Sequence, residues 1–135
     1  MLFGVGVIAI LFLVYEFVLA TLSFDQAQLG LLQAFKRDIQ TTVLGAPTAV
    51  ARDGAPVSLL RIPRLGLDRV VVEGTSPQDL KSGPGHLAVS PLPGEAGNAV
   101  IISRRVTHGG PFWALGTLRR GDPIDVTTGQ GTFVY

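Results

Sequence analysis

The chain has 135 residues, enough for one small domain and one further segment. Hydrophobic residues make up 47% and charged residues 16%, with a mean hydropathy of +0.41, which excludes a disordered tail and is unlike a typical soluble domain. The net charge of +1 excludes a broad basic surface, so we expect no nucleic-acid partner. Cysteine is absent, which excludes disulfides, cysteine-ligated metals and thiol nucleophiles within these residues.

Residues 1–23 predict a transmembrane helix, and the lipid bilayer is the first expected partner. Their single ionisable side chain is Glu16, and an apolar helix of this length spans roughly 30 Å, the thickness of a hydrocarbon core. The alternative is a cleaved signal peptide with its cleavage site at Val18-Leu19-Ala20. The sequence favours an uncleaved anchor, because no Lys or Arg precedes the apolar run and the run is long for a signal peptide.

Glu16 lies in the outer third of this span, where a carboxyl group is costly. One interpretation is that it reaches the lipid headgroups beside Tyr15. The other is that it contacts a second membrane helix.

Residues 24–44 predict a helical stalk, because apolar side chains recur there every three or four residues. The stripe consists of Phe24, Ala27, Leu31, Phe35 and Ile39. Such a stripe packs against its own domain or against a partner. We expect Phe24, Leu31 and Phe35, together with Glu16, to lie against an integral membrane protein.

Residues 45–56 predict a linker and residues 57–135 a β-rich domain. All 9 prolines and all but three of the 17 glycines follow position 44, a density that breaks helices and favours short strands. The predicted strands cover residues 57–62, 70–72, 99–102, 124–128 and 132–135, with a hairpin turn at residues 129–131. One short helix fits residues 77–81, capped by Thr75 or Ser76. The fold class is mainly β, a small barrel or sandwich on a helical stalk.

The search for reactive groups finds no established catalytic pattern. His86 and His108 are 22 residues apart, and neither has metal-ligand spacing with an acidic residue, so we predict no metal and no cofactor. No nucleophile elbow is present, and Ser103 lacks a general base that the sequence identifies.

Two arginine pairs, at residues 104–105 and 119–120, flank Trp113. They form either a solvated rim or an anionic site for a lipid headgroup, a cell-wall polymer or a partner's carboxylate. The candidate binding residues are Arg104, Arg105 and His108.

Several ordered motifs resemble actinobacterial sortases of the class E type. In the stalk they are Val14-Tyr15-Glu16 and Asp25-Gln26-Ala27-Gln28. In the β-rich part they are Ile62-Pro63-Arg64-Leu65-Gly66-Leu67, Val70-Val71-Val72-Glu73-Gly74-Thr75, Gly83-Pro84-Gly85-His86, Leu92-Pro93-Gly94-Glu95-Ala96-Gly97-Asn98, Gly109-Gly110-Pro111-Phe112 and Arg120-Gly121-Asp122.

This resemblance implies a single-pass anchor in the plasma membrane with the C-terminal domain outside the cytoplasm. The positive-inside rule alone favours the opposite orientation, because Lys36, Arg37 and Arg52 follow the span. The resemblance also implies an eight-stranded sortase barrel, of which residues 57–135 would supply the N-terminal half and leave an unpaired edge.

Sortases cleave a sorting signal with a cysteine, a histidine acts as acid/base, and an arginine steadies the oxyanion. The family histidine follows the strand at residues 99–102 in a Gly-His-Arg tripeptide, but here the tripeptide is Ser103-Arg104-Arg105. Arginine keeps its proton and cannot act as the acid/base. We therefore expect a non-catalytic scaffolding or accessory subunit, a pseudoenzyme. The alternative is the N-terminal part of an active cysteine transpeptidase that anchors proteins to the cell wall.

Overall fold

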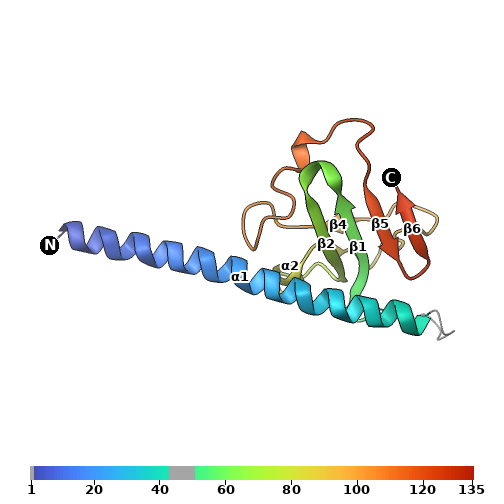
Figure 1. Ribbon diagram of the computed structural model, residues 1–135, viewed down its shortest axis with the longest axis horizontal. Helices are drawn as coiled ribbons and strands as arrows, with labels where there is room; N and C mark the ends of the chain where they lie inside the picture. The colour runs from blue at the N-terminus through green and yellow to red at the C-terminus, as the bar shows by residue number, and fades with distance from the viewer. Residues whose placement is uncertain (1, 43–50) are drawn as a thin grey trace.

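The computed structural model describes residues 2–42 and 51–135. A long helix, α1 (Leu2–Thr42), precedes one six-stranded sheet of order β4-β3-β2-β1-β5-β6 (Figure 1). The elements after α1 are β1 (Pro56–Ile62), η1 (Pro63–Leu65), β2 (Leu67–Glu73), α2 (Asp79–Ser82), β3 (Gly85–His86), β4 (Ile101–Ile102), η2 (Leu115–Thr117), β5 (Asp125–Thr128) and β6 (Gly131–Val134). Among the strands of the described residues, only β2 and β3 pair in parallel. The prediction of a mainly β fold behind an apolar helix is confirmed.

The predicted strands correspond to β1, β2, β4, β5 and β6, and β6 forms one edge of the sheet. The predicted hairpin joins β5 to β6, with Thr128 opposite Gly131. The predicted short helix is α2, with Gln78 at its N-cap position. Just before it, the Ser76 hydroxyl accepts from the Asp79 amide at 3.2 Å, and the Asp79 carboxylate accepts from the Ser76 amide at 3.0 Å. Residues 43–50, the end of the predicted stalk and the first part of the predicted linker, lie outside the described residues.

The core forms where β2 crosses β1. Val70, Val71 and Val72 are all buried, although alternate side chains of a strand point to opposite faces. β2 is therefore covered on both faces, which suits a run of stiff β-branched residues. The main cluster contains Leu60, Ile62, Leu67, Val71 and Val126. Burying each such side chain contributes about 1.5–3 kcal/mol.

Helix α1 has two parts with different surroundings. Most side chains between residues 5 and 22 are exposed and apolar, and this part of the helix is long and apolar enough to cross a membrane. Phe24 and Phe35, in contrast, are buried where α1 runs along β1 and β2 (Figure 1). The expectation that these two side chains face a membrane partner is therefore corrected, because the chain's own sheet covers them. Leu31 is half-buried, and Glu16 is exposed on the apolar part.

Gln28 binds the edge of β2 as a neighbouring strand would. Its side-chain oxygen accepts from the Val70 amide at 2.8 Å, and its amide nitrogen donates to the Val70 carbonyl at 3.2 Å. The same nitrogen donates to the Ser82 carbonyl at 2.7 Å. β3 pairs only with Val72 and Glu73, so Gln28 satisfies peptide groups of β2 that β3 does not reach. We call these three hydrogen bonds the Gln28 clamp.

Two further contacts surround the clamp. The Arg69 guanidinium lies 5.7 Å from the centre of the Phe24 ring and 3.7 Å from the Asp25 carboxylate. Gly83 passes so close to the clamp that a Cβ there would collide with the Gln28 side-chain amide and lie 2.7 Å from the Val70 carbonyl oxygen. The clamp therefore requires glycine at position 83.

We predict that Gly83→Ala destabilises the protein by about 1–3 kcal/mol, because the new methyl group must displace the buried Gln28 amide. Gly116→Ala is the matched control, since a Cβ at Gly116 meets no atom within 4 Å among the described residues. Thermal unfolding in detergent measures both variants. Equal melting temperatures for the two would contradict the clamp.

Candidate functional site

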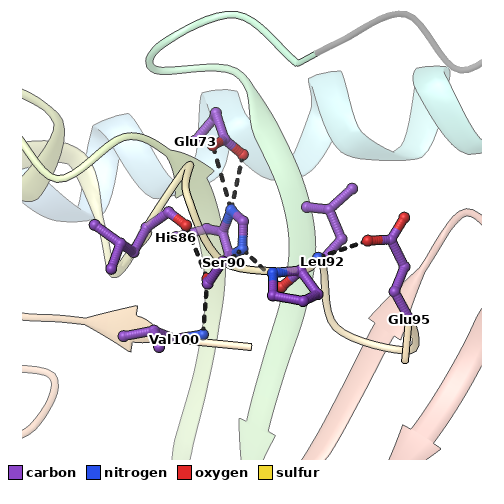
Figure 2. Close-up of polar contacts among 8 residues, drawn as sticks. Glu73, His86, Ser90, Leu92, Glu95 and Val100 are labelled. Carbon is purple, nitrogen blue, oxygen red and sulfur yellow. Dashed lines mark hydrogen bonds and ion pairs between the residues drawn. The ribbon is translucent and has the colours of Figure 1, made fainter. Parts of the chain in front are cut away.

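A buried acid–histidine pair lies at the junction of β2 and β3. The parallel register places Glu73 beside His86, and the His86 Nδ1 lies 3.0 Å and 3.3 Å from the two Glu73 carboxylate oxygens (Figure 2). The side chains are 8% and 2% exposed, respectively. A hydrogen bond at Nδ1 therefore joins the His86 ring to Glu73.

The other ring nitrogen also faces acceptors. The His86 Nε2 lies 3.0 Å from the Pro91 carbonyl oxygen and 3.1 Å from the Ser90 hydroxyl oxygen. The Ser90 hydroxyl donates its own proton to the Leu87 carbonyl at 2.8 Å and accepts from the Val100 amide at 3.1 Å. The Pro91 carbonyl can only accept, so Nε2 donates to it, and His86 is held at both ring nitrogens, by Glu73 on β2 and by the segment after β3.

The connection Ser90–His86–Glu73 has the order of a serine hydrolase triad, but its polarity is wrong for that chemistry. In a triad the serine donates to an unprotonated histidine nitrogen, which then takes its proton during attack. Here the Ser90 hydroxyl donates to the Leu87 carbonyl, and the His86 Nε2 faces the Pro91 carbonyl, which can only accept a hydrogen bond. The network therefore holds the segment between β3 and β4 in shape, and Ser90 is not an activated nucleophile.

The amino-acid sequence did not predict this network. Its members have no diagnostic spacing, and Glu73 meets His86 only through the register of a two-residue strand. The one available signal was the place of His86 in the Gly83-Pro84-Gly85-His86 motif.

The turn after this segment is fastened to the last strand. The Glu95 carboxylate accepts from the Leu92 amide at 2.9 Å, and the Glu95 amide donates to the Leu92 carbonyl at 3.0 Å (Figure 2). Gly94 has a φ of 93°, packs directly against the Phe133 ring, and donates its amide to the Tyr135 hydroxyl at 2.8 Å. The turn and β6 therefore support each other.

Arg104 follows β4, and its guanidinium binds backbone carbonyls. It donates to the Pro77 carbonyl at 3.1 Å and to the Leu80 carbonyl at 3.3 Å, with a weaker contact to the Thr107 hydroxyl at 3.4 Å. The side chain is partly buried and joins the end of β4 to the region of α2. This use of Arg104 is structural.

His108 lies near Arg104, whereas Arg105 points elsewhere. His108 has a φ of 53°, and its Nδ1 is buried without a hydrogen-bond partner among the described residues. Burial, followed by the positive charges of Arg104 and Lys81, lowers the pKa of His108 below 6.5. Arg105 is exposed and lies beside Trp113 in a separate hollow. The described residues contain no cluster of three potential metal ligands from His, Cys, Asp or Glu.

Comparison with known proteins places this geometry in context. The sortase domain family matches residues 60–135. Sortase D of Bacillus subtilis is 34% identical over 82 residues, covering 61% of this chain and 40% of the relative. Sortase SrtE1 of Streptomyces coelicolor is 36% identical over 89 residues, covering 61% of this chain and 25% of the relative. The chain thus spans less than half the length of either curated relative.

Solved structures agree with the sequence matches. The sortase E1 structure from Streptomyces coelicolor, with a tripeptide in its active site, matches at a TM-score of 0.57 and 38% identity, covering 61% of this chain and 55% of that one. Sortase E from Streptomyces avermitilis matches at 0.55 and 38%, covering 57% and 52%. Because the sortase domain covers more than half of the chain and the class E relatives share both its sequence and its fold, the chain belongs to the sortase family, of the class E type.

Proposed function

We propose that this chain belongs to a membrane-anchored protein whose sortase domain lies outside the cytoplasm and serves as a non-catalytic scaffold or accessory subunit. The proposal rests on the position of Arg104 in the family motif and on the hydrogen bonds of its guanidinium. By its resemblance to the family motif, Arg104 stands where the acid/base histidine is expected, and its guanidinium is bound to the Pro77 and Leu80 carbonyls. A permanently protonated side chain in structural use cannot exchange protons with a substrate.

The alternative function is that of the N-terminal part of an active cysteine transpeptidase. It is favoured by the coverage of the relatives, which leaves more than half of their length unmatched. The two functions differ in one measurable property, the turnover of a sorting-signal peptide.

We expect no cleavage of sorting-signal peptides by the natural full-length protein that carries Arg104. Acid/base assistance contributes about 10²–10⁴-fold to such a rate, and the covalent route also needs a thiol. The assay is peptide cleavage followed by mass spectrometry, with the Streptomyces coelicolor sortase E1 as positive control. Arg104→His in the same protein tests whether a histidine restores activity. Turnover by the unmodified protein that an alkylating reagent abolishes would favour the transpeptidase.

The extracytoplasmic location of the domain is a separate part of the proposal. It is supported by family membership and by the apolar exposed part of α1. Val89→Cys provides a single labelling site, because this sequence has no cysteine and Val89 is 89% exposed. An impermeant maleimide is expected to label this variant on intact cells. Labelling only after lysis would place the domain in the cytoplasm.

We further propose that Glu16 contacts an integral membrane partner. Its carboxyl group is exposed on a helix whose surrounding side chains are apolar, and a carboxyl group within a bilayer is costly without a partner. Purification in mild detergent should therefore retain a stoichiometric second membrane chain. Glu16→Leu should release it, whereas Val14→Ala, at an exposed position on the other side of the same helix, should not. A monomeric particle for the unmodified protein would contradict this contact.

A further inference from the structure

An open hollow of about 720 Å³ separates α1 from the segment between β4 and η2. Its lining includes Thr21 of the helix and Arg105, Val106, Gly109 and Trp113 of the segment. None of these residues belongs to the Glu73–His86 network. In Figure 1 this segment lies on the side of the domain that faces the N-terminal half of α1. We call residues 105–117 the α1-facing loop.

The loop lies at the level where the apolar part of α1 ends. About 20 helical residues cross a hydrocarbon core, so an anchor that begins near residue 2 leaves the core close to Thr21. A Cβ at Gly109 would lie 2.9 Å from the Phe24 ring, which places the loop within one helical turn of that level. If α1 is the anchor proposed above, the loop therefore lies at the depth of the lipid headgroups.

The loop is held in shape by its own backbone. The Gly110 amide donates to the Thr107 carbonyl at 3.1 Å, and the Trp113 amide donates to the Gly110 carbonyl at 2.9 Å. The Phe112 amide donates to the Arg104 carbonyl at 3.2 Å. Its exposed side chains are thus presented by an ordered backbone, which reduces the conformational entropy lost on binding.

The exposed side chains of the loop are of the types that membrane interfaces favour. Trp113 is 72% exposed and Val106 is 76% exposed, and both share the hollow with Arg105. Tryptophan is enriched at bilayer–water interfaces, and arginine binds anionic headgroups. Residues 105–117 contain one arginine, Arg105, and no acidic residue, so the charge of the loop is complementary to an anionic lipid surface.

We propose that the α1-facing loop docks on the outer surface of the bilayer that α1 spans, with Trp113 and Val106 in the interfacial layer and Arg105 on an anionic lipid headgroup. The inference rests on the proposed membrane anchor, because only an anchored chain holds the loop at this depth. Docking would give the domain two attachments to the membrane and would fix its tilt.

Trp113 reports on this directly, because it is the only tryptophan of the sequence. The full chain is reconstituted in vesicles of phosphatidylcholine with or without phosphatidylglycerol, containing lipids brominated at defined depths. We expect Trp113 emission to be quenched by bromine near the headgroups, and more strongly with the anionic lipid. Arg105→Gln should reduce the lipid-docked population about fivefold, and Val106→Ser should also reduce it.

Arg120→Gln is the matched control, since Arg120 is exposed but lies outside the lining of the hollow, and it should leave quenching unchanged. Flotation of the vesicles after an alkaline wash measures anchoring independently. Chain that floats while Trp113 stays unquenched would overturn the docking and leave the anchor intact. Chain that fails to float would overturn both. Equal quenching in all variants would show that Trp113 contacts lipid without help from Arg105 or Val106, and this result would overturn the proposed docking site.

Discussion

Three hydrogen bonds made by the Gln28 side chain connect α1 to β2 and to the end of α2, and neighbouring features of the domain are built around this clamp. At Val70 neither peptide group has a strand partner on the β3 side, and an unpaired buried peptide group costs about 1–3 kcal/mol. Gln28 satisfies both groups at once and also holds the Ser82 carbonyl. A single side chain of α1 thus completes β2 and fixes the end of α2.

The clamp also determines where the polar network forms. Gly83 passes beneath the Gln28 amide, and the chain then enters β3 at Gly85, where the parallel register brings His86 beside Glu73. His86 in turn forms a hydrogen bond with the Pro91 carbonyl. A series of contacts therefore links α1, through β2 and β3, to the segment before β4. Removing one partner of a buried hydrogen-bonded pair leaves the other unsatisfied, which is costly, so the pair favours one arrangement of the segment over others.

The sequence carried strong signals for some elements and none for others. The β-branched run at residues 70–72 and the glycines at residues 129–131 predicted β2 and the β5–β6 hairpin, because strand propensity and turn geometry are local properties. β3 has only two residues and exists through its pairing with β2, which no local pattern records. The apolar stripe of α1 was identified, but periodicity does not say what covers it, and the chain's own sheet covers Phe24 and Phe35.

The candidate site shows the same division between local and long-range information. The resemblance to the family motif identified Arg104, but its hydrogen bonds to carbonyls 24 and 27 residues earlier in the chain depend on the folded path of α2 and β4. Gln28 stood in a quoted motif without an assigned role, because a glutamine on a helix face is ordinarily solvated. Its function depends on the distant Val70, and the pairing of such residues is a property of the packed structure.

The most direct test of the account is the hydrogen exchange of the Val70 amide, measured by NMR on the full chain in nanodiscs. The Gln28 clamp predicts that this amide exchanges as slowly as the Val72 amide, which donates to the Pro84 carbonyl at 2.9 Å. Gln28→Ala should accelerate exchange at Val70 far more than in the β5–β6 hairpin. Rapid exchange at Val70 in the unmodified protein would show that α1 is not fastened to the sheet and would contradict the account.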